Sequence, residues 1–251
     1  MATKRLKWGI LGTGRIAHTF ATAVADSNCG LLEAVGSRRQ DSAQAFAAEH
    51  AIGSAYGSYE ALLADANVDA VYISLPNHLH APLAIQAAEA GKHILCEKPL
   101  AMNQFEAEAI VETARRCDVF LMEAFMYRCH PQIARVVELI REQVIGQVRH
   151  IHANFAYDAG DRPDDIRNVS AMGGGGIMDV GCYCTSAARL IAGAATGQDV
   201  AEPVEIHGVA VIPEGSEVDQ WAAAVLKFSG DISASLTCGM QLETDWTLRV
   251  Y

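Results

Sequence analysis

The stretch Trp8-Gly9-Ile10-Leu11-Gly12-Thr13-Gly14-Arg15-Ile16-Ala17 decides the fold of the first part of the chain. Its apolar beginning, residues 8–11, predicts a buried strand, and the pattern of residues 16–25 predicts a helix directly after it. Between them, Gly12 permits a tight turn, and Gly14 lets the backbone approach a pyrophosphate that faces the helix N-terminus. This context predicts a dinucleotide-binding turn, with an ordinary glycine-rich turn as the alternative. The residues expected to contact the cofactor there are Gly12, Thr13, Gly14, Arg15 and Ile16.

Short apolar runs and longer amphipathic runs continue to alternate through residue 123. This alternation, with short joints marked by glycine or proline, predicts an α/β domain with a doubly wound parallel sheet of the Rossmann type. Further strands are expected at residues 31–35, 68–74, 92–96 and 119–123. Further helices are expected at residues 42–50, 80–90 and 104–116. We assign residues 1–125 to this dinucleotide-binding domain.

The pattern changes after residue 148 to long alternating strands interrupted by one helix. Strands are expected at residues 148–157, 204–212, 220–228, 232–240 and 246–251. The helix is expected at residues 176–192, with Gly193 as its stop. Residues 126–251 therefore form a predicted α+β domain for substrate binding and oligomerisation, with an open, mainly antiparallel sheet.

The last predicted strand ends at Tyr251 without a turn or a cap. A sheet that ends in this way leaves unpaired backbone groups at its edge. We expect either that the natural chain continues beyond Tyr251 or that a second subunit covers this edge. A homo-oligomer, such as a dimer, would then form through the C-terminal sheet.

The residues after the second strand indicate which dinucleotide is bound. An NAD enzyme usually places an acidic residue about 20 residues after the glycines to hold the ribose hydroxyls. This chain has Gly36-Ser37-Arg38-Arg39 at that point. A hydroxyl from Ser37 and a guanidinium from Arg38 suit the 2′-phosphate of NADP. The sequence thus favours NADP and leaves NAD open, while exposed charges at a helix entry are the alternative interpretation.

Composition narrows the function classes and the cellular location. The chain has 251 residues, 51% of them hydrophobic, and a formal net charge of −11. The negative charge argues against binding to nucleic acid, because no basic surplus exists to neutralise phosphates. No apolar run reaches membrane-spanning length without interruption, so we expect a soluble protein with no membrane partner. The 7 cysteines are irregularly spaced, which is typical of reduced thiols in the cytoplasm.

Four further motifs carry a family resemblance. They are Leu-Pro-Asn-His-Leu-His at residues 75–80, Gly-Lys-His-Ile-Leu-Cys-Glu-Lys-Pro at 91–99, the run 123–132 beginning Glu-Ala-Phe-Met-Tyr, and the run 173–184 ending Asp-Val-Gly-Cys-Tyr-Cys. In this order they resemble the Gfo/Idh/MocA-type oxidoreductases, nearest to the dimeric dihydrodiol dehydrogenases and the NADP-linked, xylose-type aldose dehydrogenases. The resemblance implies that the following residues lie on the cofactor side: Leu75, Asn77, His80, Glu97 and Lys98. His80 could instead cap the helix that follows it.

Hydride transfer to a carbonyl leaves an alkoxide, so the site must supply a proton and stabilise negative charge. Lys98 follows a parallel strand at the edge of the sheet where ligands bind. A nearby ammonium would favour the tyrosinate form of Tyr183 and so help it to exchange a proton with the substrate. Asp179 precedes Tyr183 by four residues, on the same predicted helical face. We predict Tyr183 as the acid/base, Lys98 as its electrostatic partner and Asp179 as an acceptor for a substrate hydroxyl, with a core aromatic role as the alternative for Tyr183.

Other polar residues give weaker signals. Arg128 and Arg167 are candidate substrate contacts, with surface or packing roles as the alternative. We predict no metal site, because no histidine or cysteine group has the spacing that zinc sites usually show.

The combined prediction is an NADP(H)-dependent oxidoreductase. It would transfer a hydride between the nicotinamide and a small hydroxy or carbonyl compound, such as an aldose or a vicinal diol. Two alternatives stay open: an NAD(P)-dependent glycosidase that acts through transient oxidation, and a nucleotide-binding sensor without catalysis. The presence of both Lys98 and Tyr183 argues against the sensor.

Overall fold

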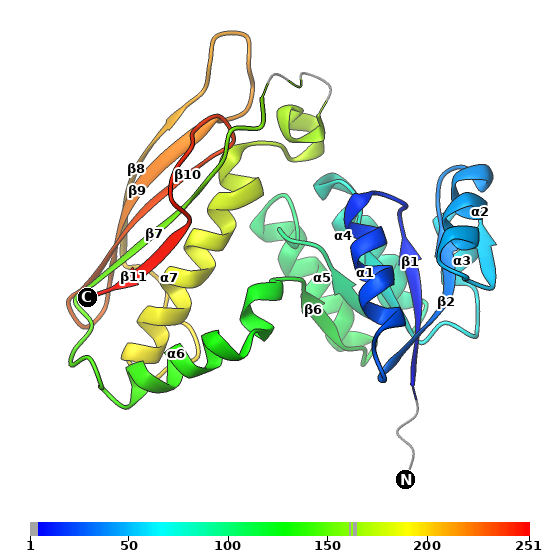
Figure 1. The fold of residues 1–251 in the computed structure, drawn as a ribbon, viewed down its shortest axis with the longest axis horizontal. Coiled ribbons are helices and arrows are strands. Elements are labelled where there is room, and N and C mark those ends of the chain that lie inside the picture. The colour runs from blue at the N-terminus through cyan, green and yellow to red at the C-terminus, as the bar shows by residue number, and fades with distance from the viewer. Residues whose placement is uncertain (1–4, 161, 163–164) are drawn as a thin grey trace. The chain divides into compact units, whose positions relative to one another are not determined.

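The computed structural model describes residues 5–160, 162 and 165–251. Six parallel strands form the centre of the first half of the chain. The chain divides into two compact units, Met1–Ala124 and Phe125–Tyr251 (Figure 1). The elements of the first unit are β1 (Leu6–Leu11), α1 (Arg15–Ala25), β2 (Gly30–Gly36), α2 (Gln40–Glu49), β3 (Ser54–Tyr56), α3 (Tyr59–Leu63), β4 (Ala70–Ile73), the short 3-10 helix η1 (Asn77–Leu79), α4 (His80–Glu89), β5 (His93–Cys96), α5 (Gln104–Arg116) and β6 (Leu121–Glu123).

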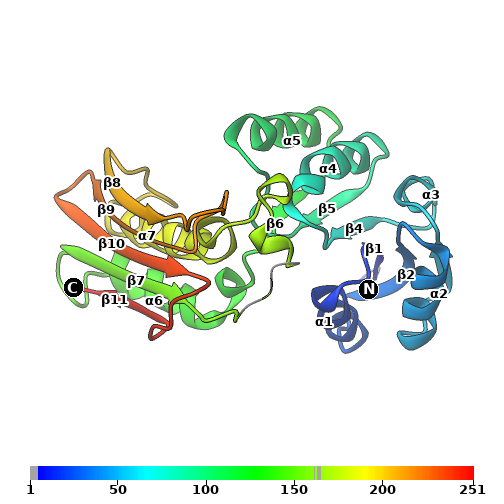
Figure 2. The ribbon, with the colours of Figure 1, turned by 90° about the horizontal axis from the view of Figure 1, so that it is seen from above.

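The first unit has three layers, with helices on both faces of the sheet (Figure 2). Successive side chains of a strand point to opposite faces. Ile10 accordingly packs in a core with residues of α1 and α2, whereas Leu11 packs in a second core with residues of α3, α4 and α5. Burial on both faces explains why these strands are short, continuous apolar runs. The predicted doubly wound sheet is confirmed.

The strand order β3-β2-β1-β4-β5-β6 reverses direction between β1 and β4. These two strands pair in parallel, with Leu11 opposite Ile73 at their carboxyl ends. In open parallel sheets, ligands bind in the crevice beyond the carboxyl ends of the strands at such a reversal. The turn after β1 and the loop after β4 flank this point.

The second unit is built on a five-stranded mixed sheet in the order β11-β7-β10-β9-β8. β7 and β10 run parallel, and the other neighbouring pairs run antiparallel, as expected for a mainly antiparallel sheet. Its elements are the 3-10 helix η2 (Met126–Cys129), α6 (Pro131–Arg141), β7 (His150–Ala156), the 3-10 helices η3 (Ile166–Asn168) and η4 (Ser170–Met172), the π-helical segment η5 (Ile177–Gly181), α7 (Cys182–Ala195), β8 (Glu205–Val211), β9 (Trp221–Phe228), β10 (Ile232–Gly239) and β11 (Thr247–Val250). Helix α7 lies along the sheet (Figure 1), where Ile191 packs in one core with Ile151 of β7.

The structure differs from the predicted elements at several places. The sequence pattern did not predict β3, α3 or α6. The predicted helix at 176–192 is divided into a π-helical segment and an α-helix, and the α-helix continues past Gly193 to Ala195. Position 193 inside the helix requires glycine because the Val200 backbone packs against it: a Cβ there would be 2.5 Å from the Val200 Cα. Among the described residues, no helix combines the length and apolar character that crossing a membrane requires.

Candidate functional site

The glycine turn after β1 has the geometry that a bound pyrophosphate needs. Gly12 has a φ of +105°, and a Cβ there would lie 2.9 Å from both the Ser74 carbonyl oxygen and the Leu75 side chain. Gly14 is the N-cap of α1, and a Cβ there would meet nothing within 4 Å. No side chain of the described residues caps α1, and its first turn holds no acidic residue. The N-terminal N–H groups of α1 are thus not opposed by a carboxylate and can face an anion.

The other residues expected to contact the cofactor at this turn are Thr13, Arg15 and Ile16. Thr13 is half-buried, and Arg15 and Ile16 are exposed at the start of α1. The three side chains therefore surround the turn without filling the space beside Gly14.

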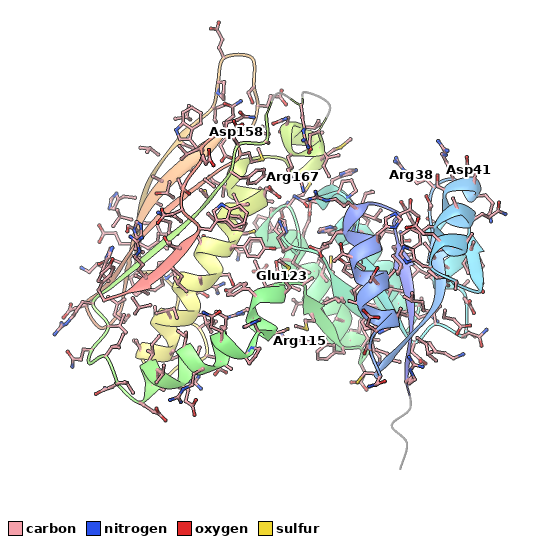
Figure 3. The ribbon with its side chains drawn as sticks, viewed as in Figure 1. Arg38, Asp41, Arg115, Glu123, Asp158 and Arg167 are labelled. Carbon is pink, nitrogen blue, oxygen red and sulfur yellow. The ribbon has the colours of Figure 1, made fainter. Side chains whose placement is uncertain are left out.

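The two arginines after β2 differ in what they contact. Arg39 is held by Asp41 through two bonds, Nε to Oδ1 at 3.0 Å and Nη2 to Oδ2 at 2.7 Å. Arg38 is exposed (Figure 3). Its positive charge and its hydrogen bond to Tyr59 oppose the rise in the Tyr59 pKa that burial causes. Ser37, the residue before Arg38, is 9% exposed. The charge of Arg39 is thus neutralised by Asp41, whereas the exposed guanidinium of Arg38 is accessible to a phosphate.

His80 joins two loops of the first unit. Its ring is fully buried, with Nδ1 2.8 Å from the Pro99 carbonyl oxygen and Nε2 2.8 Å from the Leu75 carbonyl oxygen. Burial lowers the pKa of His80, although both backbone carbonyls favour the charged ring. The ring therefore couples the loop that contains Leu75 and Asn77 to the loop that follows Lys98, and it does not cap α4 with its side chain.

Two carboxylates hold the backbone around Lys98, which follows β5. The Tyr72 hydroxyl donates to Glu97 Oε1 at 2.5 Å, and the Lys98 backbone N–H contacts Glu97 Oε2 at 3.3 Å. On the other side, the Leu100 N–H donates to Glu123 Oε1 at 2.8 Å. Lys98 itself is half-buried. Lys98 therefore lies just after the carboxyl end of β5, on a loop whose backbone is fixed by these hydrogen bonds.

Asp179, in the second unit, is oriented by a tyrosine and an arginine. The Tyr157 hydroxyl donates to Asp179 Oδ2 at 2.6 Å. Arg167 Nε forms an ion pair with Asp179 Oδ1 at 3.1 Å, and Arg167 Nη1 contacts Asp165 Oδ1 at 3.2 Å. Burial, together with the hydrogen bond to Asp179, raises the pKa of Tyr157 well above its ordinary value. Tyr157 consequently stays a hydroxyl donor, and the side chain of Asp179 is only 13% exposed.

An open hollow of about 630 Å³ adjoins this group. Tyr157 is shared between the hollow and the Asp179 group. The hollow is lined by Ala156, Tyr157, Asp158, Glu243, Thr244 and Trp246. Its lining thus combines carboxylates, hydroxyls and an indole.

Tyr183, the second residue of α7, lies within an aromatic group. Its ring centroid lies 5.3 Å from that of Phe125, 5.4 Å from that of Phe155 and 6.1 Å from that of Tyr127. The neighbouring Tyr127 hydroxyl is paired with the buried Ser186 hydroxyl at 2.8 Å, and burial raises its pKa. These contacts fix the plane of the Tyr183 ring. Lys98 belongs to the first unit, so its pairing with Tyr183 stays a prediction.

The structure brings together some of the predicted substrate residues and adds others. Asp179 and Arg167 contact each other, whereas Arg128 is exposed on η2. Asp179 lies in the π-helical segment, so its offset of four residues from Tyr183 is not that of a regular α-helix. Tyr157 and Asp165 were not predicted. The position of Tyr157 directly after β7 was the one signal that could have identified it, because strand ends often carry ligand contacts.

Two family models match the chain in succession. The first, described as the oxidoreductase family with an NAD-binding Rossmann fold, matches residues 6–125. The second, the GFO/IDH/MocA C-terminal domain, matches residues 133–251. Together they match most of each structural unit.

Proteins with similar sequences or structures include several oxidoreductases. The chain is 40% identical to the D-xylose 1-dehydrogenase (NADP(+)) 2 of Haloferax volcanii, over 91% of this chain and 68% of that protein. It is 33% identical to the trans-1,2-dihydrobenzene-1,2-diol dehydrogenase of Xenopus tropicalis, over 94% of this chain and 69% of that protein. A 3-ketoreductase from Actinomadura kijaniata, solved in complex with NADP and TDP-benzene, matches with a TM-score of 0.87 and 33% identity, covering 98% of this chain and 74% of that one.

Proposed function

Because the chain belongs to the Gfo/Idh/MocA oxidoreductase family, we propose that it is an NADP(H)-dependent dehydrogenase or reductase acting on an aldose or a vicinal diol. The reaction interconverts a CH–OH group and a carbonyl. The relatives named above include a D-xylose dehydrogenase and a dehydrogenase of a 1,2-diol, which supports a substrate with adjacent hydroxyls.

The observation that carries the proposal is the glycine turn. Gly12 adopts a backbone conformation that other residues rarely reach, and the space beside Gly14 is open. These features fit a dinucleotide, whose pyrophosphate would accept N–H donors from the start of α1. When bound, NADP(H) accepts or supplies the hydride. Ser37 and Arg38 would hold its 2′-phosphate, and Leu75, Asn77, Glu97 and Lys98 belong to the loops at the ligand-binding edge of the sheet.

Replacing Arg38 by alanine should weaken NADPH binding by about 10- to 100-fold, because a hydrogen bond to a charged group contributes about 1.5–3 kcal/mol. NADH binding should change little, since NADH has no 2′-phosphate. Arg39→Ala is the matched control, and it should change the NADPH Kd much less because Asp41 already holds that guanidinium. Nucleotide titrations followed by fluorescence measure all three proteins. Equal losses for NADPH and NADH in Arg38→Ala would contradict the 2′-phosphate role.

The proton chemistry is assigned to three side chains. Tyr183 gives a proton to the developing alkoxide in reduction and takes it back in oxidation. Lys98 contributes a positive charge to the reaction. Asp179, held by Tyr157 and Arg167, accepts a hydrogen bond from a second substrate hydroxyl. Arg167 and Arg128 are proposed as further substrate contacts.

An activity screen tests this function. Purified protein is supplied with NADP⁺ or NAD⁺ and a panel of aldoses and vicinal diols, and with NADPH and dicarbonyls in the reverse direction. We expect net formation or consumption of NADPH with at least one panel compound. Cleavage of glycosides without net NADPH turnover would instead indicate a glycosidase, and tight NADPH binding without turnover would indicate a sensor.

We also propose that the protein is a homodimer formed through the sheet of the second unit. Every residue of β8 is exposed, including Ile206 at 62% and Val209 at 73%. An apolar strand of this kind at a sheet edge is a typical association surface. We further propose a location in the cytoplasm, on the irregular spacing of the seven cysteines along the sequence.

Replacing Val209 by aspartate should convert the dimer into a monomer, because a charge would be buried in the interface without a partner. Phe105→Asp is the control, since Phe105 is 80% exposed but lies on α5 of the first unit. Light scattering coupled to size-exclusion chromatography gives the mass of each protein. A monomeric wild type, or a Val209→Asp variant that remains dimeric, would exclude this interface.

A further inference from the structure

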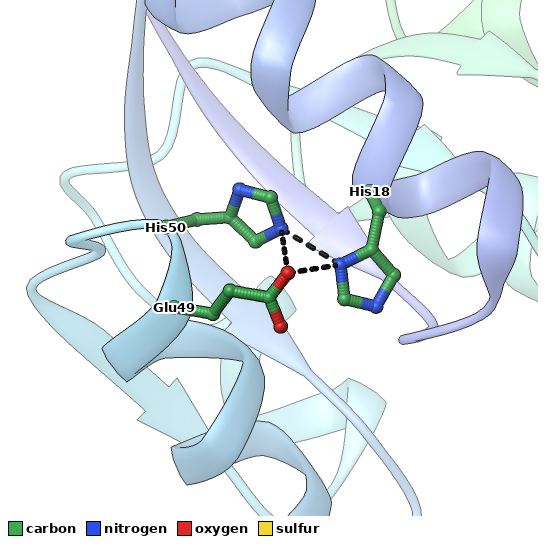
Figure 4. A group of neighbouring side chains, drawn as sticks. All are labelled: His18, Glu49 and His50. Carbon is green, nitrogen blue, oxygen red and sulfur yellow. Dashed lines mark hydrogen bonds and ion pairs between the residues drawn. The ribbon is translucent and has the colours of Figure 1, made fainter.

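Three side chains of the first unit, none of them part of the glycine turn itself, converge on one point (Figure 4). His18 Nδ1 lies 2.8 Å from His50 Nε2 and 3.1 Å from Glu49 Oε1. His50 Nε2 lies 3.7 Å from the same Glu49 oxygen. Each residue therefore contributes one atom with a lone pair to a single small triangle.

Two helices carry this triangle. His18 lies in α1, Glu49 is the last residue of α2 and His50 is its C-cap. Both imidazole rings pack against the buried Phe46, each with a centroid distance of 4.5 Å. The side chain of His50 is 11% exposed, that of His18 37% and that of Glu49 62%. The site therefore has an apolar back formed by Phe46 and an open front toward solvent.

We propose that His18, Glu49 and His50 form a binding site for a divalent transition metal ion of the zinc type. Zinc bonds to histidine nitrogen and carboxylate oxygen are about 2.0–2.1 Å long, so tetrahedral ligand atoms lie about 3.3–3.4 Å apart. The three distances in this triangle lie on both sides of that value. Two histidines and one carboxylate are a known zinc ligand set, and water on the exposed side would complete the tetrahedron.

Binding requires the lone pairs of both facing ring nitrogens. His18 must then carry its proton on Nε2, and His50 must carry its proton on Nδ1. Without the ion, one facing nitrogen instead donates an N–H to the other, and the same atoms form a hydrogen-bonded group. The two facing ring nitrogens can therefore either bind the ion or form a hydrogen bond with each other, but not both at once.

A bound ion would link α1 to the end of α2. His18 and His50 are 32 residues apart, so the ion would close a loop that the unfolded chain leaves open. Because the ligand atoms come together only in the folded unit, binding should stabilise the folded state by mass action. The sequence prediction of no metal site rested on ligand spacing along the chain, and these residues have no such spacing.

Zinc titration of the untagged protein tests the site. The background is a Cys29→Ser, Cys129→Ser protein, which removes the two exposed thiols as competing ligands. We expect one equivalent of Zn²⁺ by calorimetry, a higher melting temperature with Zn²⁺, and a tetrahedral visible spectrum with Co²⁺. Loss of an outer-shell partner alone costs about 10–100-fold in metal affinity, so His18→Gln and Glu49→Gln should each cost at least as much.

The control is His207→Gln. His207 forms an exposed pair with Glu205 at 2.7 Å, and the described residues offer this pair no third metal ligand. This variant should bind Zn²⁺ as the background does. The proposal is overturned if the background protein binds no Zn²⁺ or gains no stability from it. It is equally overturned if His18→Gln and Glu49→Gln, shown to be folded by circular dichroism, bind Zn²⁺ unchanged.

Discussion

Replacing Tyr183 by phenylalanine is expected to lower turnover by about 100- to 10,000-fold, the usual contribution of a general acid or base. The ring would keep its contacts with Phe125 and Phe155, so the second unit should remain folded. NADPH binding should be unchanged, because the glycine turn belongs to the other unit. Steady-state kinetics and nucleotide titration separate these two effects.

Tyr127→Phe is the matched control for Tyr183→Phe. It removes from the same aromatic group a hydroxyl that is paired with Ser186 and that is assigned no part in the reaction. Turnover should therefore stay near that of the wild type. If Tyr183→Phe retained full turnover, or if both variants lost the same amount, Tyr183 would not be the acid/base.

The second large effect is expected from Gly14→Ala, which should weaken NADPH binding by about 100-fold, or about 2.7 kcal/mol. The added methyl group meets nothing in the protein within 4 Å, so it occupies the space proposed for the pyrophosphate. The backbone of Gly14, with φ −78° and ψ 175°, suits alanine as well. The melting temperature without nucleotide should therefore change little.

Gly53→Ala provides the comparison. A Cβ at Gly53 also meets nothing within 4 Å, and this exposed residue lies outside the glycine turn. Both its NADPH Kd and its melting temperature should match those of the wild type. Unchanged NADPH binding by Gly14→Ala would mean that the nucleotide does not lie against the start of α1.

Local pattern determined most of the fold of the first unit. Ile10 and Leu11 are buried on opposite faces of the sheet, and such two-sided burial produces a continuous apolar run that is visible in the sequence. Two of the elements that were not predicted, β3 and α3, are short. The third, α6, has 11 residues and begins with a proline, so its amphipathic pattern was a local signal that could have identified it. β3, with three residues, is too short to show a period. Gly193 is a glycine because of its contact with the Val200 backbone, which the local pattern does not show.

The residues of the candidate site likewise divide into those that could be predicted from local sequence and those that could not. Residues in contiguous motifs, such as Gly12 and Lys98, could be predicted because the motif and its place after a strand occur together. The role of Tyr157 as a partner of Asp179 could not, since Tyr157 is 22 residues away in the sequence. The His18–Glu49–His50 triangle also exists only through the packing of α1 against the end of α2.

Transfer of deuterium tests the central claim most directly. NADPH deuterated at the nicotinamide C4 position is incubated with the protein and the carbonyl compounds of the activity panel, and the products are examined by mass spectrometry. The proposed function predicts one deuterium on the former carbonyl carbon of a product, with the hydroxyl proton taken from solvent. Bound NADPH that yields no deuterated product with any panel compound would contradict it.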